Sequence, residues 1–499
     1  MTREIFDIAV VGSGGGSILA DTAMITGHRV ALIEGTAWGG TCLNRGCIPT
    51  KIMVHAADLI RETQHAASMA LDGQPLTINW QALRERVFGK IDEGASMPDY
   101  YASAGNVVLY MAMASFAGRT SVKGEELFAL HLKTAAGDVS EILARKVVLA
   151  NGGHTFIPQG LGLEDVGFAT SESFFTPEGF PSKPYESLII VGGGDIGCEF
   201  AHIFASFGTK VKLVQHNVRL VPRQDGEISA RLLKIFEHDG VEVYLNRDTV
   251  EAGRSRNGKT MRVVHRVTGE EELLEAEEIF VSPGIRANSP SLNLAAIGLR
   301  TADNGWIETN EYLETRVPGV YALGDLNGHQ QLRHKSNYEA TILAWNLLQE
   351  GASHPDKRRQ ADYDIVPSAT FTAVQIGAVG LTEEQARWHH VPYKVGYLPF
   401  SATAQGYARG FLPDSLVDGF AKVLVTPDES RIIGVHILAP EASSLVQPYV
   451  YMMAAAKEPQ LRPDAPAVVQ RTMTIHPSLS ELPAWAIGNW REGEEEALL

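Results

Sequence analysis

Two glycine-rich turns occur far apart in the sequence, and each follows a short apolar segment. The first turn, residues 12–17 (GSGGGS), follows residues 8–11 (IAVV), and the second, residues 192–197 (GGGDIG), follows residues 187–191 (SLIIV). Short β-branched runs that end in glycine are typical of buried parallel strands, and we expect a helix after each turn. Such a strand–turn–helix unit binds the pyrophosphate of a dinucleotide at the N-terminus of its helix. The chain is therefore expected to bind two dinucleotides.

The residue at the end of the next strand differs between the two units. Glu34 ends the second strand of the first unit, where its carboxylate can accept a hydrogen bond from a ribose hydroxyl. The equivalent strand of the second unit ends in Gln215, which is not an acid. An acid there would hold the 2′-hydroxyl of NAD, whereas nearby cations such as Arg219 and Arg223 would accommodate the extra phosphate of NADP. The same arginines could equally form a solvated face, so the coenzyme stays open between NAD and NADP, with a slight lean toward NADP.

Two of the three cysteines, Cys42 and Cys47, lie five positions apart, directly after the first unit. A metal site would usually require about four ligands, and none cluster around this pair. The remaining cysteine, Cys198, follows the second glycine-rich turn, and we interpret it as a small packing residue. Thiols beside a nucleotide-binding unit indicate a redox disulfide that exchanges electrons with a flavin.

The composition and the N-terminal sequence predict the cellular compartment of the chain and two classes of partner that it lacks. The first residues are acidic where a signal peptide needs a basic start, and no apolar stretch approaches the roughly 18 residues that span a bilayer. We therefore expect a cytoplasmic chain with no membrane partner, in which a disulfide is catalytic and transient rather than structural. The formal net charge of -16 predicts no nucleic-acid partner, because phosphate binding needs a basic face.

Four further residues are candidates for thiol chemistry. Lys51 lies four residues after Cys47, one turn along a helix that continues past the pair, and its cation could stabilise a thiolate. Glu199 is the candidate partner of Lys51. His476 and Glu481 could act as a base and the carboxylate that orients it, since a free thiol is only about 3% thiolate at pH 7. Outside this context, each pair would be interpreted as structural.

Residues 39–51, 192–197, 321–325 and 476–481 together resemble the class I pyridine nucleotide–disulfide oxidoreductases, in order and spacing, over nearly the whole chain. The resemblance implies an α/β fold with two Rossmann-like dinucleotide-binding domains, one for FAD and one for NAD or NADP, and a C-terminal α+β dimerisation domain. The implied limits are residues 1–158 and 289–360 for the FAD domain, 159–288 for the NAD(P) domain and 361–499 for the dimerisation domain.

The resemblance also implies roles for single residues. Cys42 would exchange with the substrate, and Cys47 would face the flavin. Asp325 would bind the ribityl chain, and the dyad of His476 and Glu481 would come from the other subunit of a homodimer. The candidate cofactor-binding residues are Gly12, Gly14, Gly16, Glu34, Gly40, Thr41, Lys51, Gly152, Gly192, Gly194, Gly197, Gln215, Gly284, Gly324 and Asp325; no metal ligands are expected.

Two branches of the family look closest. Dihydrolipoamide dehydrogenases are similar in the run around the cysteines and in residues 476–481, and we take them as the first choice, with a small dithiol or a lipoyl-carrying protein as partner. Mycothione reductases are similar in residues 199–202, 332–340 and 440–447, so the alternative is an NADPH-dependent reductase of a small disulfide. Mercuric reductases and high-molecular-weight thioredoxin reductases are set aside, because no cysteine follows Cys198.

Some positions depart from the family pattern, and other function classes stay open. Ser17 stands at the third small position of the first turn, Asn151 replaces a threonine, and Asp195 stands where the family has an apolar or aromatic residue over the nicotinamide pocket. A non-catalytic scaffold subunit of a multienzyme complex would retain the fold without needing the thiols. A flavin-dependent NAD(P)H oxidase or quinone reductase would also work without them.

Overall fold

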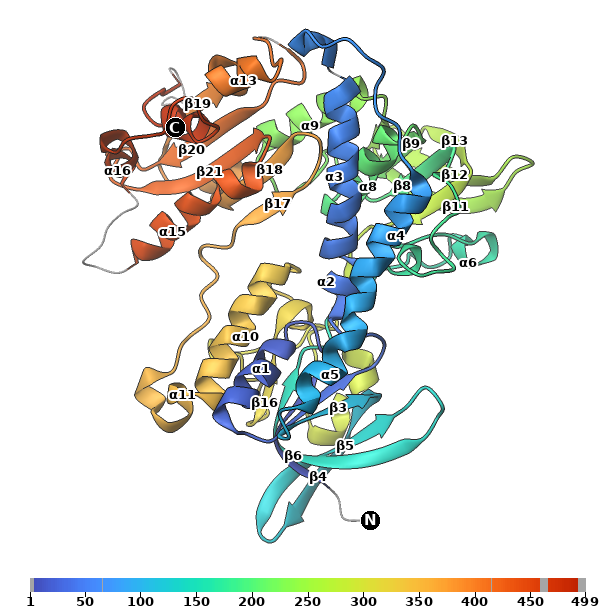
Figure 1. The fold of residues 1–499 in the computed structure, drawn as a ribbon, viewed down its shortest axis with the longest axis vertical. Helices are drawn as coiled ribbons and strands as arrows, with labels where there is room; N and C mark the ends of the chain where they lie inside the picture. Colours follow the sequence, from blue (N-terminus) through green and yellow to red (C-terminus); the bar gives the residue numbers. More distant parts are fainter. Residues whose placement is uncertain (1–3, 65, 414, 458–464, 492–499) are drawn as a thin grey trace.

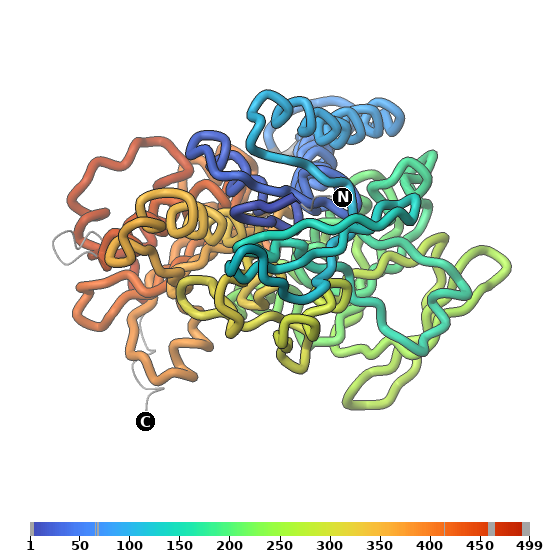
Figure 2. Tube along the Cα trace, turned by 90° about the horizontal axis from the view of Figure 1, so that it is seen from below, coloured from blue at the N-terminus to red at the C-terminus, as the bar shows by residue number. Residues whose placement is uncertain are grey.

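Three sheet-containing lobes make up the protein in the computed structural model, which describes residues 4–64, 66–413, 415–457 and 465–491. The first lobe holds the N-terminal segment and a returning segment around residues 289–348, the second holds residues around 160–280, and the third holds the C-terminal part (Figure 1). Seen from below, the second and third lobes lie on opposite sides of the first (Figure 2).

The first lobe is built on a seven-stranded sheet, which is parallel through its centre and antiparallel at one edge. Its strands are β3 (Val107–Met111), β2 (Val30–Glu34), β1 (Ile5–Val11), β6 (Val139–Leu149), β5 (Glu125–Lys133) and β4 (Met113–Val122) in sheet order, with β16 (Val320–Ala322) paired to β6. Successive side chains of β1 enter two different cores, Phe6, Ala9 and Val11 on one face and Ile8 and Val10 on the other. A sheet covered on both faces explains the continuous apolar run of this strand.

Helices α1 (Ser17–Thr26) and α10 (Arg333–Leu348) cover one face of this sheet and share one core through residues such as Leu19 and Leu343. Because α10 comes after the second lobe in the sequence, the chain returns to the first lobe through β16. Two long helices lead away from the sheet, α3 (Cys47–Gln64) and α4 (Trp80–Ile91). Figure 1 shows α3 rising from the first lobe toward the other two.

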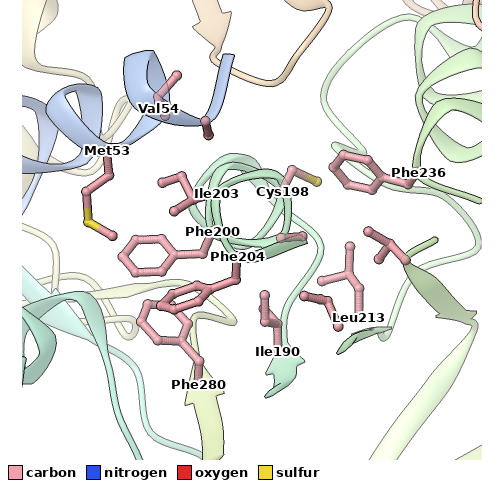
Figure 3. Packing of buried hydrophobic residues seen from close by; sticks show 14 of the residues in the cluster. Met53, Val54, Ile190, Cys198, Phe200, Ile203, Phe204, Leu213, Phe236 and Phe280 are labelled. Atoms are coloured by element: carbon pink, nitrogen blue, oxygen red, sulfur yellow. The ribbon is translucent and has the colours of Figure 1, made fainter. Parts of the chain in front are cut away.

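The second lobe repeats the parallel strand–helix plan. Its sheet has the order β10 (Glu242–Leu245), β9 (Lys210–Gln215), β8 (Ser187–Val191) and β14 (Glu278–Val281), with α8 (Asp195–Ser206) and α9 (Gly226–His238) beside it and an antiparallel sheet of β11 (Arg247–Arg254), β12 (Lys259–His265) and β13 (Glu271–Ala276). Phe200 of α8 stacks on Phe280 of β14 with ring centroids 4.1 Å apart. Met53 and Val54 of α3 enter the same core (Figure 3), so the packing fixes α3 of the first lobe against α8 of the second.

The third lobe is an antiparallel five-stranded sheet with helices. Its strands are β17 (Ser368–Thr370), β18 (Gln375–Gly380), β21 (Ile432–Ala439), β20 (Phe420–Val425) and β19 (Lys394–Pro399) in sheet order, and its helices include α12 (Glu383–Trp388), α14 (Ala442–Leu445), α15 (Gln447–Ala455), α16 (Pro466–Arg471) and α17 (Glu481–Ala486). The polar stretch before it, residues 350–362, carries the short helices α11 (Glu350–Ser353) and η6 (Pro355–Lys357).

The predicted fold class is confirmed: two parallel α/β units with dinucleotide-type turns precede an α+β lobe. The short strands β7 (Gly153–Thr155) and β15 (Ile285–Ala287) pair where the chain passes into and out of the second lobe, and on this basis we propose domain limits at 158/159 and 288/289. Within the part of the chain that the structure describes, no helix is both long and apolar enough to cross a membrane.

Candidate active site

The first glycine-rich turn links β1 to α1 by close backbone packing. Gly12 has a φ of 106°, and a Cβ at this position would lie 2.3 Å from the carbonyl oxygen of Ala150, so only glycine fits. A Cβ on Gly16 would lie 2.1 Å from the carbonyl oxygen of Gly12. The helix therefore meets the turn at Gly16 rather than at Ser17, whose hydroxyl donates to the carbonyl of Gly14 at 3.0 Å. The serine at the third small position is accommodated without loss of this contact.

Glu34 at the end of β2 holds this turn in place. Its Oε2 accepts hydrogen bonds from the backbone N–H of Ser13 at 3.0 Å and from the Ser13 hydroxyl at 2.7 Å. Its Oε1 accepts from the backbone N–H and the hydroxyl of Thr36, at 3.0 and 3.2 Å. These bonds occupy the roughly four lone-pair sites of a carboxylate. A ribose hydroxyl can replace either side-chain hydroxyl, because hydroxyl groups rotate.

The second glycine-rich turn has the same construction with a different side chain at the strand end. Gly192 has a φ of 110°, and a Cβ on Gly197 would lie 1.8 Å from its carbonyl oxygen. Gln215 at the end of β9 accepts from the backbone N–H of Gly193 at 3.1 Å and donates to the carbonyl of Arg219 at 3.2 Å. A neutral amide therefore makes the contact that Glu34 makes in the first unit.

The two arginines predicted near the end of β9, Arg219 and Arg223, differ in whether their side chains already have partners. Arg219 forms an ion pair with Glu384 at 2.9 Å and donates to the carbonyl of Pro222 at 3.0 Å. Arg223 is exposed, and its side chain lies on the wall of the main cavity. Among the described residues, Arg223 forms no hydrogen bond or ion pair. Arg223 is thus the cation that is free to meet a ligand here.

Cys42 and Cys47 lie on two consecutive helices, α2 (Gly40–Arg45) and α3, and both thiols are free and half-buried. A hydrogen bond between the two side chains lowers the pKa of Cys42 from 9.0 to about 6 against the opposing effect of burial, with Arg333 and Lys51 adding to the decrease. The same hydrogen bond, together with burial, raises the pKa of Cys47. Cys42 is therefore the thiol that ionises first and the better nucleophile.

Lys51 lies one turn after Cys47 on α3 and forms an ion pair with Glu199 of α8. Its Nζ is 2.7 Å from Oε1 and 2.6 Å from Oε2 of Glu199, which is the partner that the sequence predicted. The backbone N–H of Phe371 also donates to Glu199 at 3.1 Å. Burial raises the pKa of the Glu199 carboxyl, while Lys51 acts in the opposite direction. Asp195, at the start of α8, accepts a hydrogen bond from the hydroxyl of Thr370 at 2.6 Å.

Asp325 lies at the other end of the site, in η5 (Gly324–Asn327). Burial raises the pKa of Asp325 to about 6. Beneath it, Lys335 and Glu339 of α10 form a buried ion pair at 3.0 Å. Glu339 also accepts from the backbone N–H of Gly324 at 2.7 Å, which fixes the segment that carries Asp325. This pair was not predicted from the sequence, although the i,i+4 spacing of Lys335 and Glu339 on a helix could have indicated it.

One cavity of about 2080 Å³ joins the two glycine-rich turns and passes the thiol pair. This exceeds the roughly 300–1,000 Å³ typical of a single small-molecule site. The predicted site residues on its wall are Gly12, Gly14, Glu34, Gly40, Thr41, Cys42, Cys47, Lys51, Gly152, Gly192, Gly194, Glu199, Gln215, Gly284, Gly324 and Asp325. Gly16 and Gly197 pack behind the turns and do not line the cavity. His476 and Glu481 do not line it either.

The first half of this cavity fits the dinucleotide that the sequence predicts. The glycines at positions 12 and 14–16 leave space for a pyrophosphate, and Glu34 offers an acceptor for a ribose. Asn151 lines the same wall, and its side-chain Oδ1 is buried without a hydrogen-bond partner. Buried polar atoms normally have partners, so this oxygen indicates a donor supplied by a ligand. Gly12, Gly14, Glu34, Asn151 and Asp325 could thus hold FAD.

His476 and Glu481 form a contact of their own, away from the cavity wall. The ring Nδ1 of His476 lies 2.5 Å from Oε1 of Glu481, and the backbone N–H of Ser478 donates to Oε2 at 3.2 Å. The histidine side chain is 66% exposed, whereas that of the glutamate is 1% exposed. The buried carboxylate orients the ring. The second ring nitrogen could therefore exchange a proton with a group outside this lobe.

Some residues of the site were missed by sequence reasoning. Ser13 lies within the first glycine-rich turn without a predicted role, yet its hydroxyl donates to Glu34 at 2.7 Å and accepts from the backbone N–H of Gly39 at 2.9 Å. Arg333 lies on the same wall as the thiols, but no local motif marks it. Only the return of α10 to the first lobe places it there.

Comparisons with known proteins agree with this geometry. The family model described as pyridine nucleotide-disulphide oxidoreductase matches residues 6–344, and the model of that family's dimerisation domain matches residues 366–487. Mycothione reductase of Mycobacterium tuberculosis is 32% identical over 480 residues, which cover 96% of this chain and 98% of the relative. Dihydrolipoyl dehydrogenase of Chlamydia trachomatis is 30% identical over 490 residues, which cover 97% and 96%.

A solved structure gives the same result for the fold. The Cu(II) complex of the HOCl-induced flavoprotein disulfide reductase RclA from Escherichia coli superposes with a TM-score of 0.80 at 25% identity, covering 98% of this chain and 99% of that one. These matches confirm the resemblance inferred from the motifs.

Proposed function

This chain belongs to the pyridine nucleotide-disulphide oxidoreductase family, and from that premise we propose that it is a thiol–disulfide oxidoreductase whose redox pair is Cys42 and Cys47. The family binds FAD and depends on NAD(P). The observation that carries the proposal is that two free, half-buried thiols lie on the wall of the one cavity that both dinucleotide-type turns also line. A scaffold subunit would need the turns and the core but not a thiol with a lowered pKa.

Gly12, Gly14, Glu34, Asn151 and Asp325 would hold FAD, which would supply hydride exchange with a nicotinamide and electron transfer to the disulfide. The residues of this chain then carry out thiol exchange. The Cys42 thiolate attacks a substrate disulfide, so that a Cys42–substrate bond forms and one substrate thiol leaves. Cys47 next attacks the Cys42 sulfur, which releases the second thiol and restores the Cys42–Cys47 disulfide. The dithiol loses two electrons and the substrate gains two; a dithiol substrate runs the same steps in reverse.

In this mechanism Lys51 and Glu199 stabilise the thiolate of Cys47. The ammonium lies one helical turn from Cys47 and favours its thiolate, while Glu199 holds that ammonium in one place. Because α3 and α8 come from different lobes, their ion pair also fixes the distance between the thiols and the second glycine-rich turn. Proton control and positioning are the contributions of the protein to a reaction whose hydride chemistry belongs to the cofactor.

We further propose that His476 and Glu481 act in the site of a second copy of this chain. The exposed histidine and its buried carboxylate are oriented for proton transfer but are absent from their own chain's cavity wall. Large apolar side chains around them are exposed, among them Met473, Ile475 and Trp485. A homodimer that covers this surface would bring the histidine of one subunit to the thiols of the other, which the match to a dimerisation domain supports.

As the specific reaction, we propose first that of a dihydrolipoamide dehydrogenase, with free dihydrolipoamide or a lipoyl-carrying protein as substrate. The alternative is an NADPH-dependent reductase of a small disulfide, supported by the 32% identity to mycothione reductase and by a strand end without an acid. A panel of dihydrolipoamide, a lipoylated protein and small disulfides, each with NAD(H) and NADP(H), separates them. Turnover of dihydrolipoamide with NAD supports the first choice, and NADPH oxidation by a small disulfide alone supports the second.

Thiol counting tests the general proposal. Anaerobic reduction of the purified enzyme with NADH or NADPH should expose two thiols to alkylation, located at Cys42 and Cys47 by peptide mass. Cys47→Ser should abolish turnover of any disulfide or dithiol, while Cys198→Ala, a change at a buried packing position, should keep it. If NAD(P)H oxidation continued after alkylation of reduced Cys42 and Cys47, the enzyme would instead be an oxidase or quinone reductase.

A further inference from the structure

Arg333 places a second cation on the wall that carries the thiols. It is the first residue of α10, and its Nη2 donates to the carbonyl of Gly14 at 3.4 Å. Gly14 in turn packs on Gly40, since a Cβ on Gly40 would lie 2.7 Å from the Cα of Gly14. Gly40 begins α2, only two residues before Cys42. A chain of contacts therefore fixes the guanidinium relative to the exchange thiol.

Of the cations on this cavity wall, Arg333 and Lys51 act unequally on the two sulfurs. Arg333 favours the thiolate of Cys42 more strongly than Lys51 does. At Cys47, Lys51 is the cation that favours the thiolate. The charge of Lys51 is matched by Glu199 at 2.6 Å, whereas Arg333 forms no ion pair among the described residues. Asp325, on the same wall, interacts with Arg333 only at longer range.

We propose that Arg333 is a positioning residue for thiol exchange, which holds the Cys42 thiolate at the cavity wall while Lys51 serves Cys47. The proposal rests on the proposed function, since it assumes that Cys42 exchanges with substrate. An arginine side chain does not lose its proton at accessible pH, so Arg333 stabilises the anion without acting as the base. Its charge favours the Cys42 thiolate within one subunit, whereas a histidine of the partner would take or give the thiol proton. Cys42 should thus remain a thiolate when no base is in place.

The experiment is alkylation of Cys42 as a function of pH. The holoenzyme is reduced with a phosphine and treated with iodoacetamide, whose iodide leaves as the sulfur–carbon bond forms, and the Cys42 peptide is quantified by mass spectrometry. The groups that face Cys42 are Cys47 and Lys51 of α3 and Arg333 of α10. Because the pKa of Cys42 is lowered to about 6, the rate should reach half its plateau near that pH.

Arg333→Gln should move the midpoint upward and reduce the alkylation rate at pH 6 about fivefold, since the loss of an opposite charge nearby shifts a pKa by roughly one unit and the thiolate fraction then falls from about one half to about one eleventh. Arg333→Lys should restore most of the rate. Arg119→Leu, which removes an exposed arginine from β4 outside the cavity, is the matched control and should leave the midpoint unchanged. Arg333→Met provides a second neutral side chain should the glutamine variant not fold.

An unchanged midpoint in both neutral variants would overturn the role of Arg333, while reduction by NAD(P)H and disulfide turnover would still stand. A wild-type enzyme that gains no thiols on reduction by NADH or NADPH would instead overturn the proposed function. The two failures are therefore distinguishable.

Discussion

The two glycine-rich units of this protein have the same backbone but end in different side chains. In the first, the carboxylate of Glu34 accepts the N–H of Ser13 at 3.0 Å; in the second, the amide oxygen of Gln215 accepts the N–H of Gly193 at 3.1 Å. Each contact ties the middle of the turn to the end of the neighbouring strand. The fold thus requires an acceptor at this place, but it does not require a charge.

The charge of the side chain at the strand end can therefore differ between the two units and determine which ligand each unit binds. Glu34 accepts from four donors of Ser13 and Thr36 and carries a negative charge beside the turn that we propose for FAD. A carboxylate at the equivalent place of the second unit would repel the 2′-phosphate of NADP, whereas Gln215 does not. Arg223, exposed on the same wall, adds a positive charge that has no partner within the described part of the chain. The second unit is thus compatible with both coenzymes.

The largest expected effect comes from the glycines that both units share. Gly16→Ala and Gly197→Ala would place a Cβ 2.1 and 1.8 Å from a backbone carbonyl oxygen, and backbone cannot move aside cheaply. We expect each to destabilise the protein by roughly 1–3 kcal/mol, as overpacking does. Gly16→Ala should lose FAD, measured as flavin absorbance per chain, and Gly197→Ala should lose nicotinamide binding while FAD remains.

Gly89→Ala is the matched control for this pair. Gly89 lies inside α4, and a Cβ there would have no neighbour within 4 Å, so the change should keep both ligands. Loss of FAD in Gly197→Ala with nicotinamide binding intact would reverse our assignment of the two units.

Exchange of the strand-end side chains tests the comparison more finely. Glu34→Gln keeps one acceptor for Ser13 but cannot accept from all four donors, and the loss of buried hydrogen bonds should cost about 1–3 kcal/mol and weaken FAD binding. Gln215→Glu keeps the contact to Gly193 and adds a charge, so the Kd of NADPH should rise about tenfold, equivalent to about 1.4 kcal/mol, while that of NADH does not rise. Calorimetric titration of both coenzymes measures this. Equal changes for NADH and NADPH would show that the strand end does not read the 2′ position.

The parts of this comparison that could be predicted were local in sequence. Apolar runs that end in glycines predicted β1 and β8, and Lys51 was expected to pair with Glu199 because both lie at fixed offsets from motifs. Arg333 could not be placed this way, because its position depends on the return of α10 past the second lobe. Hydrogen bonding also lay outside the prediction: nothing in the sequence indicated that Ser13 and Thr36 would occupy the Glu34 carboxylate.

The smallest expected effect concerns Arg223. The side chain of Arg223 lines the cavity without a partner among the described residues, so Arg223→Ala should leave the stability of the protein nearly unchanged. It should weaken NADPH binding about threefold to tenfold, because an exposed cation that contacts one phosphate contributes about 1 kcal/mol to binding. NADH binding should not change. Arg219→Ala is the contrasting variant: its guanidinium already pairs with Glu384 and the carbonyl of Pro222, so its removal should lower the melting temperature without changing the ratio of the two affinities. If Arg223→Ala left that ratio unchanged as well, Arg223 would not contact the 2′-phosphate and would have no part in coenzyme choice.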